Sequence, residues 1–183
     1  MTTGDDAPLG VLVVCVGNRC RSPLAERLLQ QRLDRAAPGR AVVTSAGTIG
    51  PDGHPMDADA AAELVRLGGD PAGFVARRLT PEMAAGADLV LTATADLRQR
   101  VVALTPRALK RTFTLTELAA VLEAGGLDDV ALRDLPRAAA ARRPAAAAAP
   151  DVPDPIGLGP QAHREAADRI EAAVDVIAAA LAR

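Results

Sequence analysis

The sequence has no tryptophan, no tyrosine and only two phenylalanines among its 183 residues. Because tyrosine is absent, regulation through modification of the chain's own tyrosines is excluded. Two cysteines, and a polar, acidic segment over residues 1–10 where an export signal would be apolar, indicate a reducing cytoplasmic location. No apolar run approaches the length of a membrane span, so we expect no membrane partner. The 21 basic and 23 acidic residues nearly cancel, which predicts no broad surface for nucleic acid.

Histidine is equally scarce. His54 and His163 lie far apart in the sequence and match no zinc-ligand spacing with Cys15 and Cys20. We therefore predict no metal site and no cofactor, and we expect both histidines on the surface or in loops.

A chain of this length is long enough for one domain with an ample core. We predict a flexible N-terminus over residues 1–9 and one domain over residues 10–183. Within it, residues 136–150 stand apart because they are rich in Pro, Ala and Arg and show no core-facing pattern. The prolines at 136, 144 and 150 interrupt any long helix. This segment either lets the loop that follows it open and close, as a lid, or it is a passive linker.

Apolar runs and helical periodicities give the expected elements. The predicted strands cover residues 11–14, 41–45, 87–92 and 111–115. The predicted helices cover residues 23–36 and 57–67, a short stretch from residue 80, a segment over 97–104, a segment over 118–122 with Thr116 as its N-cap, and a final helix over 170–181. This alternation predicts a single-domain α/β fold: a flavodoxin-like, doubly wound, four-stranded parallel sheet with helices on both faces. Ligands bind at the carboxyl edge of such sheets.

The most informative stretch is the loop over residues 15–22, called the Cys15 loop from here on, which directly follows the first predicted strand. Ser22 is expected to cap the next helix, and Pro23 to occupy its first position. Such a loop directs backbone N–H groups and the positive end of a helix into one cavity that suits a phosphate-sized anion. The predicted phosphate-binding residues are Val16, Gly17, Asn18, Arg19, Cys20 and Arg21.

Cys15 and Arg21 give this loop its expected chemistry. The thiolate is the reactive form of cysteine, and the N–H donors, the helix N-terminus and Arg21 all stabilise it. The planar guanidinium can hold two phosphate oxygens while Cys15 meets the phosphorus in line. A cysteine followed by an arginine six residues later is a weak signal by itself, and the alternative is a buried cysteine beside an ordinary strand-to-helix turn. The preceding strand and the residues Gly17, Asn18 and Ser22 favour the catalytic interpretation.

At these residues the chain resembles a known family. The segment over residues 14–23 is similar to the phosphate loop of the low-molecular-weight protein tyrosine phosphatases. That family also carries a general acid in an Asp-Pro motif near the C-terminus, and residues 151–157 place such a motif just before the final predicted helix. The resemblance runs from about residue 11 to residue 181 and is weakest over residues 125–150.

The resemblance implies specific roles. Cys15 would be the nucleophile that forms a phosphocysteine intermediate, and Arg21 would stabilise the oxygens of the transferred group. Asp154 would protonate the leaving oxygen and then take a proton from the attacking water. Asp151 is the competing candidate for this acid. The hydroxyl of Ser22 would hydrogen-bond to the Cys15 thiolate and ease its departure, the alternative being that Ser22 serves only as an N-cap.

Two further pairs have expected roles. Asn18 and Ser45 resemble a pair that ties the loop in shape in this family, and an asparagine tolerates the left-handed backbone that a tight loop needs. Cys20 lies five residues from the nucleophile, within reach of a disulfide on a curled loop. We hypothesise that a Cys15–Cys20 bond protects the nucleophile from irreversible oxidation. The alternative is that Cys20 is a small side chain that fills the core.

The chain departs from the family's pattern at three places. Arg19 stands where tyrosine-specific members commonly have isoleucine and arginine-specific members have threonine, and a cation there would repel a guanidinium. The aromatic side chains usual after the acid are replaced by Ile156 and Gly157, and the loop around Gly50 has no aromatic wall. Phe74 stands where many relatives have a histidine that steadies the loop, which leaves part of the hydrogen bonding unexplained.

Taken together, the sequence predicts a cytoplasmic, metal-free phosphomonoester hydrolase that acts on phosphotyrosine in proteins, as a monomer or weak homodimer. The nearest alternatives are phosphatases of phosphoarginine or of small phosphorylated metabolites. Arsenate reduction is disfavoured, because its thiol relay needs further cysteines and only Cys20 remains. A non-catalytic module that binds phosphorylated partners is the alternative from a different class.

Overall fold

The computed structural model describes residues 7–50, 52–143 and 149–183. In chain order its elements are β1 (Leu9–Cys15), α1 (Arg21–Ala36), β2 (Ala41–Gly47), α2 (Ala58–Arg66), α3 (Pro81–Gly86), β3 (Leu89–Thr92), α4 (Ala95–Leu104), η1 (Pro106–Arg111), β4 (Thr112–Thr114), α5 (Leu115–Glu123), α6 (Leu135–Ala141) and α7 (Pro160–Leu181). The strands form one sheet in the order β2-β1-β3-β4, and every neighbouring pair is parallel. The predicted four-stranded, doubly wound parallel sheet is confirmed.

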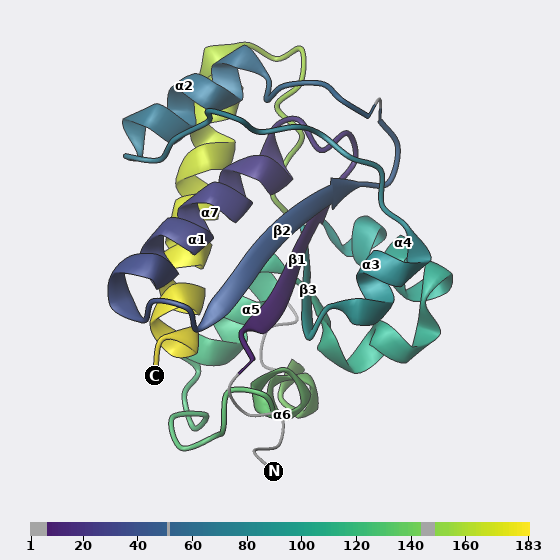
Figure 1. Ribbon diagram of the computed structural model, residues 1–183, viewed down its shortest axis with the longest axis vertical. Coiled ribbons are helices and arrows are strands. Elements are labelled where there is room, and N and C mark those ends of the chain that lie inside the picture. The colour runs from purple at the N-terminus through teal and green to yellow at the C-terminus, as the bar shows by residue number, and fades with distance from the viewer. Residues whose placement is uncertain (1–6, 51, 144–148) are drawn as a thin grey trace.

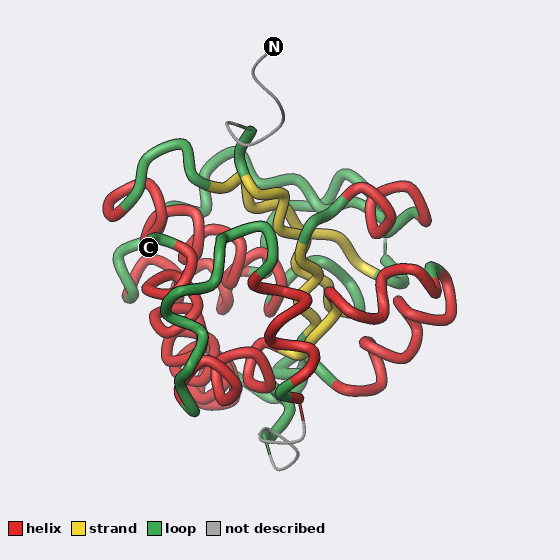
Figure 2. The backbone as a smooth tube through the Cα atoms, turned by 90° about the horizontal axis from the view of Figure 1, so that it is seen from below, coloured by secondary structure: helices red, strands yellow, loops and turns green. Residues whose placement is uncertain are grey.

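Helices cover both faces of this sheet (Figures 1 and 2). On one face lie α1, α5 and α7, with α2 packed against α1 and α7, while α3 and α4 cover the other face. The alternation of side chains along β1 explains the two layers. Val11 and Val13 belong to the larger apolar cluster, whereas Leu12 and Val14 belong to the smaller one on the opposite face. A strand buried on both faces needs an uninterrupted apolar run, and that run is what the sequence provides.

The topology places the Cys15 loop at the point where the order of the strands reverses. From β1 the chain moves to β2 on one side, and β3 then pairs with β1 on the other side. Ligand sites in open α/β sheets form at this switch point, outside the carboxyl ends of the strands. This end of the sheet is the upper one in Figure 1.

The start of α1 differs from the prediction. The helix begins at Arg21, two residues before the expected start at residue 23, and Cys20 rather than Ser22 occupies the N-cap position. The carbonyl of Cys20 accepts the first helical hydrogen bond, from the N–H of Leu24, at 3.2 Å. Ser22 therefore lies inside the first turn, and the proposal that it serves as N-cap is wrong.

The start of α5 also corrects the prediction. Thr114 is the N-cap, and its hydroxyl accepts a hydrogen bond from the N–H of Glu117, whose carboxylate accepts one from the N–H of Thr114. This reciprocal capping box satisfies two N–H groups at once, which fixes the helix start. Thr116, the predicted cap, instead donates to the carbonyl of Pro150 at 2.7 Å. The β4 strand is shortened accordingly to residues 112–114.

The Pro/Ala/Arg-rich segment over 136–150 is not loop throughout. Its first part belongs to α6, in which Leu135, Pro136 and Ala139 are buried. Pro136 is tolerated because it stands in the first turn, where its missing N–H has no helical partner in any case. Residues 144–148, which include the middle of the suggested lid or linker, lie outside the described residues. At the N-terminus, Leu9 is buried and is the first residue of β1.

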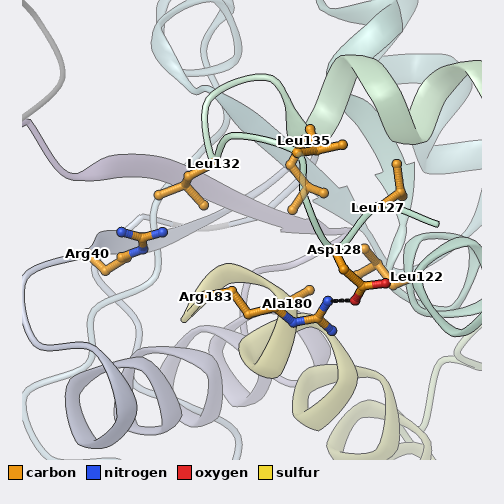
Figure 3. Close-up of a pocket in the computed structure, with 9 residues that line it drawn as sticks. Arg40, Leu122, Leu127, Asp128, Leu132, Leu135, Ala180 and Arg183 are labelled. Atoms are coloured by element: carbon orange, nitrogen blue, oxygen red, sulfur yellow. Dashed lines mark hydrogen bonds and ion pairs between the residues drawn. The ribbon is translucent and has the colours of Figure 1, made fainter. Parts of the chain in front are cut away.

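One pocket at the far end of the sheet is very small. It is lined by Arg40, Leu127, Leu132 and the end of α7, and it is bridged by an ion pair between Asp128 and Arg183 (Figure 3). Its volume of about 20 Å³ admits roughly one water molecule. Within the described residues, every helix is either too short or too polar to pass through a lipid bilayer.

Candidate active site

Cys15 is buried at the end of β1 and receives a hydrogen bond from within its own loop. The hydroxyl of Ser22 donates to Cys15 Sγ at 2.9 Å, as expected from the sequence. The same hydroxyl oxygen accepts a hydrogen bond from Asn18 Nδ2 at 2.9 Å. Because Ser22 is completely buried in the first turn of α1, its hydroxyl is held toward the sulfur. A donor fixed in this way stabilises negative charge on sulfur.

Asn18 fixes the shape of the Cys15 loop. It has a positive φ of 52°, a conformation that asparagine adopts more readily than most residues. Its Nδ2 group also donates to Ser45 Oγ at 2.8 Å, and its Oδ1 atom accepts the N–H of Arg77 at 2.9 Å. The expected Asn18–Ser45 contact is therefore present. The amide is fully hydrogen-bonded inside the protein, which makes the loop a rigid platform.

The sequence did not reveal that Glu26 continues this network. The hydroxyl of Ser45 donates to Glu26 Oε2 at 2.5 Å, so a chain of hydrogen bonds runs from Glu26 through Ser45, Asn18 and Ser22 to Cys15. The carboxylate of Glu26 thus supplies a hydrogen-bond acceptor to the network, where the replacement of a histidine by Phe74 had left part of the hydrogen bonding unexplained. Burial raises the pKa of Glu26, and the Ser45 hydrogen bond opposes the shift only in part.

Phe74, which replaces the expected histidine, is buried and lies beneath the Arg27 guanidinium at 5.8 Å. Arg27 also approaches Glu26 Oε1 at 3.6 Å. A histidine in this place would add hydrogen-bonding groups beside the network, whereas phenylalanine adds none. The loop is therefore steadied from the α1 side, by Glu26.

Glu26→Gln tests this network through the pH dependence of stability. A carboxyl whose pKa is raised on folding stabilises the protein below its ordinary pKa of 4.5, and this contribution is lost as the pH rises through the folded value. We expect the free energy of unfolding of Glu26→Gln to rise relative to wild type between pH 4.5 and pH 7, as measured by urea denaturation at both pH values. The exposed Glu123→Gln is the control. Parallel pH profiles for wild type and Glu26→Gln would contradict a buried, charge-destabilised Glu26.

A second loop presses against the first. The N–H groups of Thr48 and Ile49 donate to the carbonyls of Cys15 and Val16 at 3.0 and 2.9 Å. Gly47 makes this approach feasible, because a Cβ atom there would lie 2.7 Å from the carbonyl oxygen of Val16. The carbonyl groups of Cys15 and Val16 therefore accept hydrogen bonds from this second loop.

The N–H groups of the loop remain available. No described residue accepts a hydrogen bond from the backbone N–H of Gly17, Asn18, Arg19 or Cys20. Successive N–H groups beside a helix N-terminus bind anions, since they offer several donors to one group of oxygens. This arrangement supports the predicted phosphate-binding residues.

Arg21 brings the predicted acid to the loop. The side chain is 4% exposed, and its Nη2 atom lies 2.7 Å from Asp154 Oδ2. Its Nη1 atom donates to the carbonyl of Val152 at 3.1 Å, whereas its buried Nε atom has no hydrogen-bond partner among the described residues. A buried donor without a partner costs about 1–3 kcal/mol, which a bound oxyanion would recover.

Asp151, the competing acid, faces away from the loop. Its Oδ1 atom accepts the N–H of Ala95 at 2.8 Å, at the start of α4. The carbonyl of Asp151 accepts from Arg169, and the N–H of Val152 donates to the carbonyl of Ala93 at 2.9 Å. These contacts anchor the chain just before Asp154. Asp154 itself is 45% exposed at the side chain, so its carboxyl group is in contact with water.

Arg19 leans toward α2. Its Nη2 atom lies 3.9 Å from Asp57 Oδ2, and its side chain is 38% exposed. Exposed aliphatic residues surround the site instead of aromatic ones, as expected: Val16, Ile49 and Ile156 are all solvent-accessible.

The expectation that both histidines are surface or loop residues is wrong for His163. It lies in the first turn of α7, is 4% exposed, and reaches Asp57 Oδ1 at 3.8 Å. Cys20, the candidate redox residue, is buried beside it. No sequence spacing connects these residues, because they come from three elements that only the fold brings together.

These features define a class: α/β proteins that carry a cysteine and an arginine on one loop at the switch point of a parallel sheet. The sequence pattern of the family "Low molecular weight phosphotyrosine protein phosphatase" matches residues 10–130. The chain belongs to this family.

Individual relatives agree with this placement. Low molecular weight protein-tyrosine-phosphatase Etp of Escherichia coli K12 is 43% identical over 103 residues, which make up 56% of this chain and 66%, slightly under two thirds, of Etp. Two solved structures are also similar. The YwlE arginine phosphatase from Geobacillus stearothermophilus has a TM-score of 0.73 at 27% identity and covers 94% of this chain and 92% of its own. Wzb from Vibrio vulnificus, in complex with benzylphosphonate, has a TM-score of 0.69 at 25% identity, with coverage of 93% and 97%.

Proposed function

We propose that this protein is a phosphomonoester hydrolase that acts through a phosphocysteine intermediate. One observation supports the proposal: Cys15, Arg21 and Asp154, separated by up to 139 positions in the chain, meet at one loop. Ser22 donates a hydrogen bond to Cys15, and the Arg21 guanidinium forms a 2.7 Å ion pair with the Asp154 carboxylate. The proposed catalytic domain comprises residues 10–183. It needs neither a metal nor a cofactor for this chemistry, since nucleophile, oxyanion clamp and acid are all side chains.

The first proposed step transfers the phosphoryl group to sulfur. The Cys15 thiolate attacks phosphorus in line while the bond from phosphorus to the leaving oxygen breaks. Asp154, protonated, gives its proton to that oxygen. Arg21 and the N–H groups of the Cys15 loop bind the three remaining oxygens, with the unpartnered Nε atom as one donor.

The second proposed step releases phosphate. Asp154, now a carboxylate, takes a proton from water, and the water oxygen attacks phosphorus as the sulfur–phosphorus bond breaks. Ser22 donates to the departing sulfur over the distance of 2.9 Å seen between Oγ and Sγ. The cycle thus returns Cys15 as a thiolate and Asp154 in its protonated form.

The direct test is hydrolysis of p-nitrophenyl phosphate by the purified chain. We expect stoichiometric release of p-nitrophenol and inorganic phosphate in the presence of a chelator. Binding of phosphate without turnover would instead assign the site to a non-catalytic module.

Phosphotyrosine in proteins is the proposed substrate, and phosphoarginine is the second candidate because one structural relative is an arginine phosphatase. Arg19 carries the choice. The positive charge of its guanidinium is only partly compensated by the Asp57 carboxylate, 3.9 Å away. This charge repels the cationic guanidinium of phosphoarginine. The aliphatic residues Ile49 and Ile156 offer apolar surface to an aromatic ring without stacking on it. Cytoplasmic location and a monomeric or weakly dimeric state belong to the same proposal.

Arg19→Ile tests this choice. We expect the ratio of kcat/KM for phosphoarginine to that for phosphotyrosine to rise about tenfold, the size of one partly screened charge pair. Both substrates are measured as peptides of the same sequence, with Arg27→Ile as a control for loss of a nearby charge. An unchanged ratio would show that Arg19 does not select the substrate.

We also propose that Cys20 forms a reversible disulfide with Cys15 under peroxide, which is reduced again by thiols. Both cysteines are free and buried in this structure. Equal recovery of activity by wild type and Cys20→Ser after peroxide and thiol treatment would exclude protection by Cys20.

A further inference from the structure

Three potential metal ligands of different chemistry meet behind the Cys15 loop. Cys20 precedes α1, Asp57 precedes α2, and His163 lies in the first turn of α7. Their ligand atoms, a thiol sulfur, a carboxylate oxygen and an imidazole nitrogen, all lie within 4.8 Å of one another. None of these three side chains takes part in the phosphoryl transfer proposed above, in which Cys20 contributes only its backbone N–H group.

The imidazole of His163 and the thiol of Cys20 form no hydrogen bonds with described residues. The side chain of His163 is 3% exposed, and its Nε2 atom lies 3.8 Å from Asp57 Oδ1, which is too far for a hydrogen bond. The thiol of Cys20 likewise has no hydrogen-bond partner among the described residues. The imidazole and the thiol therefore have no hydrogen-bond partner among the described residues and lie beside a carboxylate, a combination of groups that metal ions bind.

The space between them is small. Cys20 and His163 line a common cavity of about 10 Å³ together with Arg21 and apolar side chains such as Leu24 and Ile170, and Asp57 lies outside this lining. This volume is near the minimum for one water-sized sphere. A single ion fits such a space, whereas an organic ligand does not.

We propose that Cys20, Asp57 and His163 bind one divalent transition-metal ion of borderline softness, with Zn²⁺ as the best match. Zn²⁺ prefers sulfur, imidazole nitrogen and carboxylate oxygen at about 2.0–2.3 Å, and three protein ligands leave one tetrahedral position for water. Ligand atoms around such an ion lie roughly 3.5 Å apart. The observed separations, at most 4.8 Å, would have to close by up to about 1.3 Å when the ion binds.

The negative charge of Asp57 favours a cation at this site, and the guanidinium of Arg19 competes with that cation for the carboxylate. The Asp57 carboxylate supplies negative charge beside the Cys20 thiol and the His163 imidazole. Metal binding forms the sulfur–metal bond, and the proton of the thiol passes to solvent. The half-exposed Arg19 lies 3.9 Å from the second carboxylate oxygen of Asp57 and must turn outward to make room. Asp57 also caps α2, and its lone pairs suffice for both roles.

The ion would join the Cys15 loop to α2 and α7. With its sulfur held by the metal, Cys20 cannot form a disulfide with Cys15, so metal occupancy and the disulfide exclude each other. The site therefore couples metal availability to the redox protection of the nucleophile.

Cobalt binding to the full-length Cys15→Ser variant tests the proposal, because this variant removes the only other thiol. We expect one Co²⁺ per chain, displaced by one Zn²⁺, with a thiolate-to-cobalt charge-transfer band in the near ultraviolet. Cys20→Ser in the same background loses the band. Asp57→Asn, which keeps a good helix cap, and His163→Gln weaken binding at least about 100-fold, because second-shell changes alone cost 10–100-fold. Arg19→Ile strengthens it.

The exposed His54→Gln is the matched control and should bind like its parent. Circular dichroism separates loss of binding from loss of folding, and Asp57→Asn and His163→Gln provide two independent variants. The proposal is overturned by a band that depends on Cys15 in the wild-type chain and not on Cys20, by unchanged affinity in folded Asp57→Asn and His163→Gln, or by the absence of stoichiometric binding. None of these outcomes depends on catalysis, so the proposed function is tested separately.

Discussion

Cys15→Ser is expected to reduce the hydrolysis of p-nitrophenyl phosphate by roughly 10⁴-fold or more, since loss of a covalent nucleophile removes the whole two-step route. Serine keeps the size of the side chain, and Arg21 and the loop N–H groups are unchanged. The variant should therefore still bind phosphate. Activity is measured by nitrophenol release, and binding by calorimetry with inorganic phosphate.

Cys20→Ser is the matched control for Cys15→Ser. It changes the other buried cysteine, which lies on the same loop but does not receive the Ser22 hydrogen bond. We expect it to retain turnover within a few-fold of wild type. Activity that survives in Cys15→Ser and vanishes in Cys20→Ser would reverse the assignment of the nucleophile.

Asp154→Asn is expected to reduce turnover of substrates with poor leaving groups by about 10²–10⁴-fold, the usual contribution of a general acid. Asparagine accepts a hydrogen bond from Arg21 as the carboxylate does, but it has no proton to give. The loss should shrink for substrates whose leaving oxygen needs no protonation. A series of aryl phosphates with leaving groups of increasing basicity measures this dependence as the slope of log kcat/KM.

Asp151→Asn is the internal control for the acid. Its side chain holds the N–H of Ala95 and does not contact the Cys15 loop, so the slope across the series should match that of wild type. A steep slope in Asp151→Asn, with wild-type behaviour of Asp154→Asn, would transfer the role of acid to Asp151.

The sequence predicted well those features that depend on local pattern. The uninterrupted apolar run of β1 and the apolar stripe of α7 follow from periodicity, and the Cys15 loop is contiguous, so its nucleophile and arginine are visible as one motif. The position of Asp154 followed from a second motif. The structure adds the reason for preferring it to Asp151: only Asp154 reaches Arg21.

Other features depend on long-range contacts and had no local signal. Glu26 looks like an ordinary polar residue of α1, and only the packing of β2 beside that helix brings Ser45 to it. His163 stands among polar residues at the start of α7, yet the approach of α2 buries it next to Asp57. The start of α5 was misplaced by two residues because several neighbouring threonines are equally good caps on composition alone.

The central claim, that sulfur carries the phosphoryl group, is tested most directly by trapping the intermediate. Wild type and Ser22→Ala are mixed with an aryl phosphate, quenched in acid within the first turnover and digested for mass spectrometry. We predict one phosphoryl group on the peptide that contains Cys15, in larger amount for Ser22→Ala, because the departing sulfur has lost its hydrogen-bond donor. Turnover with no phosphorylated peptide, or with the group on a residue other than Cys15, would contradict the account.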